Sequence, residues 1–171
     1  MKKYIAFLRG INVGNIRIKM PDLKTAFEKM NFRNVTTYLQ TGNVVFDSEK
    51  KIPEIKAILE QGLTETFHYQ AFVLLYEFDS LAEIIEKYPF EKVGSHHAYI
   101  IFVEENAVFE ELLSISYGMD EEIAAGKTVL YWKVLKGETL HTPFAKIIAK
   151  AKYKSTTTVR NINTLEKMLE S

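Results

Sequence analysis

Apolar runs and amphipathic stretches alternate along the first 78 residues. Four apolar runs predict strands: Tyr4–Leu8, Val35–Leu39, Val44–Phe46 and Ala71–Phe78. The first run is closed by Arg9-Gly10, and the turn Thr41-Gly42-Asn43 between the second and third is typical of a β-hairpin. This part of the chain therefore contributes four short strands.

Two helices are predicted between these strands. Pro21 and Asp22 suit a first helical turn, because proline lacks the amide hydrogen that is unpaired there and an acidic side chain suits the positive end of the helix dipole. Pro53 opens the second helix. The expected buried stripes are Leu23, Ala26, Phe27 and Met30 in the first helix and Ile55, Ile58, Leu59 and Leu63 in the second. The resulting order β-α-β-β-α-β is that of a ferredoxin-like fold.

The second half repeats this order in part, without apparent sequence identity between the halves. It contains a helix after Asp79, a strand at Ala98–Val103, a helix at Ala107–Tyr117 and a hairpin around Gly126. Two helices follow, so a helix stands where the last strand of a ferredoxin-like unit should be. We expect an α+β protein of two ferredoxin-like units, residues 1–78 and residues 79–171, the second of them incomplete.

Charge is uneven along a chain whose net charge is zero. Residues 1–33 carry net +6 and residues 79–126 carry net −9. Ordinary solvated surface explains this, and so does a basic region that attracts anions beside an acidic one that repels polyanions. The second interpretation favours a small anionic partner over a nucleic acid, which remains the less favoured alternative.

Cysteine is absent from the 171 residues, which excludes disulfides and thiolate chemistry and fits a reducing compartment. The apolar stretch near the N-terminus, which ends at Arg9, is too short for a signal peptide or a membrane span. We expect a soluble cytoplasmic protein with no membrane partner. The oligomeric state is left open.

A glycine-rich loop follows the first predicted strand. Gly10, Asn12 and Gly14 permit positive φ angles, so the backbone of this loop can form an anion-binding nest beside Arg9 and Lys19. A bulge or crossover loop that merely needs glycine is the alternative. The spacing matches neither a phosphate-binding P-loop nor a dinucleotide fingerprint.

Two further turns are rich in amide side chains. Gln40 and Asn43 exceed what the hairpin turn at Gly42 requires, and both offer donors and acceptors to a ligand. Near the C-terminus, Arg160 and Asn161 precede the last predicted helix. They are expected either to cap that helix or to hold an anion. We expect all three segments to meet in one cleft.

These motifs, in this order, resemble the DUF1697 family of bacterial proteins. The resemblance rests on three segments: Leu8–Gly14 with Lys19-Met20, Tyr38–Phe46, and Thr157–Thr164. It spans essentially the whole chain and implies a fold of two ferredoxin-like units. The family's function is not established, so the resemblance implies a candidate site and no activity.

The preferred function is the binding of a small anionic or nucleotide-like ligand. Single-stranded nucleic-acid binding is an alternative that would need exposed sheet aromatics such as Phe7, Tyr38 and Phe46. An enzyme acting on a phosphorylated small molecule is another, with Tyr38 and His141 as titratable candidates, but we assign no catalytic residue. The candidate ligand-binding residues are Arg9, Gly10, Asn12, Gly14, Lys19, Gln40, Gly42, Asn43, Arg160 and Asn161.

Neither a metal nor a cofactor is expected. Adjacent His96 and His97 would point to opposite faces of a strand. The acidic groups Glu104-Glu105, Glu110-Glu111 and Asp120-Glu121-Glu122 are typical of solvated surface. Tyr131 and Trp132 are expected in the core.

Overall fold

A computed structural model of the chain describes residues 1–12, 15–115 and 118–170. Two compact units divide the chain. Unit 1 runs from Met1 to Ala82 and includes the end of the chain from Lys167, and unit 2 runs from Glu83 to Glu166. The expected boundary followed residue 78, whereas the compact units divide after Ala82.

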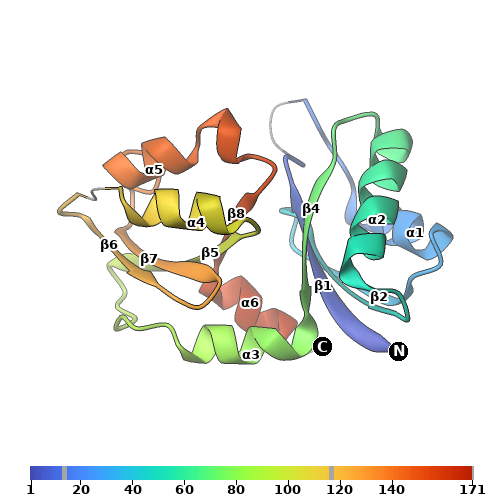
Figure 1. Cartoon of the computed structure of the whole chain (residues 1–171), viewed down its shortest axis with the longest axis horizontal. Coiled ribbons are helices and arrows are strands. Elements are labelled where there is room, and N and C mark those ends of the chain that lie inside the picture. The colour runs from blue at the N-terminus through green and yellow to red at the C-terminus, as the bar shows by residue number, and fades with distance from the viewer. Residues whose placement is uncertain (13–14, 116–117, 171) are drawn as a thin grey trace. The chain divides into compact units, whose positions relative to one another are not determined.

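Unit 1 is an antiparallel four-stranded sheet in the order β2-β3-β1-β4, with α1 and α2 on one face (Figure 1). Its elements are β1 (Lys2–Arg9), α1 (Met20–Lys29), β2 (Arg33–Tyr38), β3 (Asn43–Ser48), α2 (Ile52–Phe67) and β4 (Phe72–Glu77). This is the predicted ferredoxin-like order, with the predicted hairpin between β2 and β3.

The two helices of unit 1 begin and end where the sequence favours it. Pro21 and Asp22 lie in the first turn of α1, and α2 is followed by His68, whose left-handed backbone (φ 58°) closes the last turn. The buried side chains of α1 are Leu23, Ala26 and Phe27, and those of α2 are Ile55, Leu59 and Leu63. These stripes pack against the β1 and β3 side chains that point to the same face, such as Phe46.

Unit 2 has the same topology, with sheet order β6-β7-β5-β8. It contains β5 (His96–Val103), α4 (Asn106–Leu113), β6 (Glu121–Ala125), β7 (Val129–Leu135), α5 (Pro143–Ile148), the 3₁₀ turn η1 (Ala151–Tyr153) and β8 (Thr157–Asn161). Two helices, α3 (Phe78–Glu86) and α6 (Ile162–Met168), follow β4 and β8 respectively. Side chains of α4 and α5 join the unit 2 core with those of β5 and β7, on the face that these helices cover in Figure 1.

The prediction of an incomplete second unit is wrong, because β8 supplies its last strand. Strand β8 pairs with β5 from Thr157↔Val103 to Asn161↔Tyr99. Threonine and valine favour extended backbone, but five residues with four polar side chains do not form an apolar run. The strand is therefore recognised by its partner and not by its own pattern.

The predicted surface position of Glu121 is also wrong. It was expected at the surface within an acidic run, but it is 3% exposed, whereas its neighbour Glu122 is exposed. Its carboxylate accepts hydrogen bonds from the indole Nε1 of Trp132 (2.9 Å) and the backbone amides of Gly118 (2.8 Å) and Phe144 (3.3 Å). The alternation of a strand sends Glu121 inward and Glu122 outward. Tyr131 and Trp132 are buried, as predicted.

Candidate functional site

The first two predicted motifs meet in unit 1. The side-chain amide of Asn12 donates to the backbone carbonyls of Gln40 (2.6 Å) and Ile18 (3.2 Å). Its Oδ1 accepts from the Ile18 amide at 2.9 Å. Asn12 itself has φ 55°, in the left-handed region that asparagine tolerates. The side chain of Asn12 thus fastens the loop to the hairpin turn.

Asn43 holds the hairpin turn from inside. It is fully buried, and its Nδ2 donates to the backbone carbonyl of Tyr38 and the hydroxyl of Thr41, both at 2.8 Å. Buried amides need such partners, because an unpaired one is costly. The two asparagines that sequence interpretation assigned to a ligand therefore stabilise the backbone of this turn and loop.

Gly42 is required by the packing of the same turn. Its φ is +86°, and a Cβ atom there would lie 2.7 Å from Ile11 Cδ1 and 2.8 Å from Leu8 Cβ. We expect Gly42→Ala to lower the free energy of unfolding by about 2–4 kcal/mol, combining backbone strain with overpacking. Chemical denaturation measures it.

Gly137 is the matched control for this prediction. Its φ is +91°, but no atom lies within 4 Å of a Cβ built there. Gly137→Ala should therefore cost only the backbone strain, about 1–2 kcal/mol. Equal losses from the two variants would show that the contacts with Leu8 and Ile11 do not matter.

The remaining unit 1 candidates are close in sequence to the loop and turn held by Asn12 and Asn43. Arg9 ends β1 partly buried, and that burial lowers the pKa of its guanidinium. Gly10 has the positive φ (77°) that was expected. Lys19, at the start of α1, and Gln40 have exposed side chains, and Gly14 lies outside the described residues. Ligand contact by these residues stays a prediction.

Arg160 and Asn161 lie in β8 of unit 2. Arg160 is 8% exposed, and its Nη1 donates to the Val159 carbonyl at 3.1 Å. The Oδ1 of Asn161 accepts from the Asn163 amide at 2.9 Å. This is helix capping of α6, one of the two roles expected for this residue. Whether Arg160 belongs to a site with the unit 1 loop stays a prediction.

A cavity of about 340 Å³ opens at one end of the unit 2 sheet. Strand β5 is central and antiparallel to both β7 and β8, so the start of β5 lies beside the ends of its two neighbours. The pairs Ala98↔Lys133 and Tyr99↔Asn161 mark this place. The lining consists of Tyr88, Glu91, Lys92, Val93, Gly94, His96, His97, Ala98, Lys133, Lys136, Asn161, Ile162 and Asn163.

Positive charge dominates this cavity, which has three lysines against one carboxylate, that of Glu91. Lys92 pairs with Glu166 at 2.7 Å, and Lys133 lies 3.8 Å from Glu122. Lys136 forms no ion pair with any residue that the structure describes. One ammonium group is thus uncommitted and a second is only loosely paired, which favours an anion.

Neutral donors add to the lysines. Burial, aided by Glu122, raises the pKa of Tyr88 to about 12, so its hydroxyl keeps its proton at neutral pH. That hydroxyl is buried and has no hydrogen-bond partner among the described residues. His96 Nδ1 lies 2.8 Å from the Ser95 hydroxyl. The cavity therefore combines cations with neutral hydrogen-bonding groups.

Sequence interpretation missed this cavity because its residues come from three stretches of the chain, residues 88–98, 133–136 and 161–163. One feature of the sequence could have indicated the cavity. Residues 127–171 are basic, with nine lysines and arginines against three glutamates. The two histidines were expected on opposite strand faces, and the β5–β7 register places them so, since His96 pairs with Leu135 and His97 with Val134. Both line the cavity because they begin the strand.

The alternatives need other features. Phe7 and Phe46 are fully buried, so neither can stack on a nucleic-acid base as placed. Burial, aided by Glu170, raises the pKa of Tyr38, which makes it a poor base at neutral pH.

Within the described part of the chain, no group of three or more His, Cys, Asp or Glu side chains could hold a metal ion. None of the helices described is both long and apolar enough to cross a membrane.

Comparison with known proteins identifies a family and a fold. The family model described as "Protein of unknown function (DUF1697)" matches residues 1–131. The solved structure of the conserved bacterial protein SP0830 from Streptococcus pneumoniae is similar, with a TM-score of 0.83 and 21% sequence identity. The similarity covers 100% of this chain and 99% of that one. No curated protein matches the sequence.

Proposed function

We propose that this chain, which belongs to the DUF1697 family of proteins of unknown function, binds a compact anion in the unit 2 cavity. The observation that carries the proposal is the lining, which contains three lysines, Asn161 and Asn163 against one carboxylate. Phosphate, alone or on a small organic molecule, is the anion class that this mixture of cations and neutral donors suits.

The size of the cavity supports a small ligand. Pockets for small molecules usually span about 300–1,000 Å³, and this one lies at the lower end of that range. Residues 79–126, which precede β7 in the sequence, carry a net charge of −9. This negative charge disfavours the binding of a long polyanion. A compact anion responds mainly to charges within about 8–10 Å at physiological salt.

No general acid or base is assigned, so binding without catalysis is the proposed activity. The loop at Arg9, Lys19 and Gln40 is kept as the alternative position for the same ligand. A nucleic-acid partner and a reaction on a phosphorylated molecule are the other outcomes that a binding experiment distinguishes.

We also propose a cytoplasmic location in a bacterium. The absence of cysteine from the 171 residues suits a reducing compartment, and the resemblance to DUF1697 proteins implies a bacterial source.

A thermal-shift and calorimetric screen tests the proposal, with inorganic phosphate, pyrophosphate, sugar phosphates, nucleotides and a single-stranded oligonucleotide as probes. A ligand at about a hundredfold over its dissociation constant should add about 2.7 kcal/mol to the free energy of unfolding. We expect at least one compact phosphate compound to bind, more weakly as salt rises. Tighter binding of the oligonucleotide with a steep salt dependence would favour the nucleic-acid alternative.

A further inference from the structure

Lys133 belongs to two cavities of unit 2. Besides the unit 2 cavity, a second cavity of about 300 Å³ opens where β6 begins beside the end of β7. We call it the acidic cavity, and its lining consists of His96, Met119, Asp120, Glu121, Glu122 and Lys133. His96 and Lys133 line both cavities. One lysine is thus shared by a basic cavity and an acidic one.

The sheet register gives Lys133 a different neighbour on each side. The residue directly opposite it in β6 is Glu122, and the one opposite it in β5 is Ala98. Directly opposite residues of neighbouring strands point to the same face of a sheet, with Cβ atoms about 4.5–5.5 Å apart. On the β6 side Lys133 therefore has a carboxylate, whereas on the β5 side it has only the methyl group of Ala98, a residue that lines the unit 2 cavity.

Glu122 holds Lys133 loosely. The Nζ atom of Lys133 lies 3.8 Å from Oε2 of Glu122, which is beyond hydrogen-bond distance. The side chain of Lys133 is 15% exposed and that of Glu122 is 59% exposed. Among the residues that the structure describes, Lys133 has no hydrogen-bond partner and no second ion pair. A largely buried ammonium group with one distant counter-ion is poorly compensated for its lost hydration.

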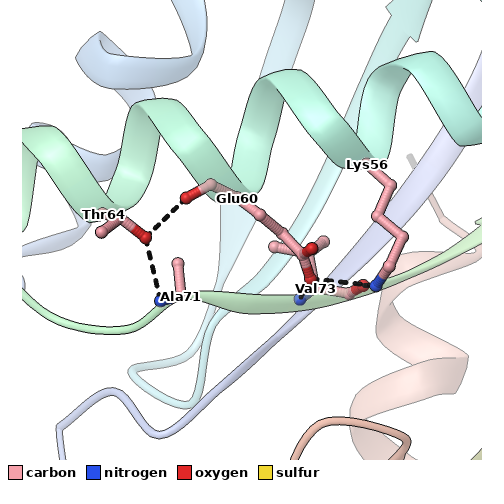
Figure 2. A network of polar contacts seen from close by, with 5 residues as sticks. All are labelled: Lys56, Glu60, Thr64, Ala71 and Val73. Carbon is pink, nitrogen blue, oxygen red and sulfur yellow. Dashed lines mark hydrogen bonds and ion pairs between the residues drawn. The ribbon is translucent and has the colours of Figure 1, made fainter.

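A tightly held lysine in unit 1 shows the difference (Figure 2). Lys56 Nζ lies 2.9 Å from Glu60 Oε2 and donates to the Val73 carbonyl at 2.7 Å. The same oxygen of Glu60 accepts from the Val73 amide at 2.9 Å. Both charged groups therefore have two partners at hydrogen-bond distance, and an anion would gain little from Lys56. The ammonium group of Lys133 is the more available of the two.

We propose that Glu122 competes with the bound anion for Lys133, holding the lysine until an anion enters the unit 2 cavity and takes its place as counter-ion. This inference rests on the proposed function. A lysine side chain has a flexible four-carbon stem, so the ammonium group can turn from Glu122 towards the β5 side without movement of β7. Because the anion must replace Glu122, this carboxylate lowers the affinity of the site and sets its strength.

The test compares the binding of inorganic phosphate to Glu122→Gln and to the wild type by isothermal titration calorimetry. Glutamine matches glutamate in size and removes the charge that attracts Lys133. We expect Glu122→Gln to bind phosphate about fivefold more tightly, which corresponds to about 1 kcal/mol, the upper end for a partly exposed ion pair.

Asp120→Asn is the matched control. It removes the same charge from the same acidic cavity, but Asp120 is exposed and forms no ion pair with any lysine that the structure describes. Its affinity for phosphate should stay within about twofold of the wild type, because an exposed charge is screened by salt.

A second control removes the lysine itself. Glu122→Gln is combined with Lys133→Ala and compared with Lys133→Ala alone. The gain in affinity should disappear, because the group for which Glu122 competes is absent.

Amide chemical shifts of Gly94 and Asn163, which line the unit 2 cavity, separate this inference from the proposed function. Phosphate-dependent shifts at these residues, with equal affinities of Glu122→Gln and the wild type, would overturn the competition and leave the unit 2 site standing. Equal gains in Glu122→Gln and Asp120→Asn, or a gain that persists without Lys133, would also overturn it. No shifts at these residues in either protein at millimolar phosphate would overturn the site and the competition together.

Discussion

Replacing Glu121 with alanine should lower the free energy of unfolding by about 3–5 kcal/mol, among the larger effects of a single substitution. The carboxylate accepts three hydrogen bonds, from the Trp132 indole and from the amides of Gly118 and Phe144. Removing it leaves these donors without an acceptor in a site where Glu121 is 3% exposed. The measurement is urea denaturation followed through Trp132, the single tryptophan.

Two variants control this prediction. Glu121→Gln keeps one acceptor oxygen but loses the charge, so the loss should be about 1–2 kcal/mol. Glu122→Ala removes an exposed neighbour whose contact with Lys133 spans 3.8 Å, so its effect should be about 0.5 kcal/mol or less. If Glu121→Ala and Glu122→Ala unfold at the same urea concentration, the buried hydrogen bonds of Glu121 contribute nothing measurable.

Replacing Lys133 and Lys136 together with alanine should weaken phosphate binding about a hundredfold, taking about 1.4 kcal/mol for each lost ammonium contact. Lys133 lies in β7 beside Ala98, and Lys136 lies just beyond the end of that strand. Both line the same cavity. Isothermal titration calorimetry with the phosphate compound that binds the wild type measures the change.

Lys24→Ala/Lys154→Ala is the matched control, because it removes two exposed lysines that do not line the cavity. It should bind as the wild type does. Arg9→Ala tests the alternative position, because it should weaken phosphate binding only if the ligand lies at the unit 1 loop. A loss of affinity in Arg9→Ala, with none in the Lys133/Lys136 variant, would move the proposed site to unit 1.

The fold of unit 1 was predictable because its signals are local. The stripe of Leu23, Ala26 and Phe27 and the hairpin turn at Gly42 depend on residues a few positions apart. Strand β8 has no such signal, since its threonines become a strand only by pairing with β5. Glu121 is similar, because its burial depends on Trp132 in the neighbouring strand.

The candidate site was less predictable than the fold. Asn12 and Asn43 were predicted to contact a ligand, which stays a prediction, and their amides bond backbone carbonyls of the chain itself. The sequence alone does not distinguish a side-chain amide that binds a ligand from one that hydrogen-bonds the backbone of its own loop. The cavity depends on sheet order, which brings Lys92, Lys136 and Asn163 together from distant segments.

A phosphate titration followed by amide chemical shifts in isotope-labelled protein measures most directly whether unit 2 binds the anion. We predict saturable shifts for amides that line the cavity, Gly94, His97 and Asn163 among them, and none of comparable size at Asn12 or Gln40. The same shifts should be lost in Lys133→Ala/Lys136→Ala. Saturable shifts centred on Asn12 and Gln40, or none anywhere at millimolar phosphate, would contradict the unit 2 site.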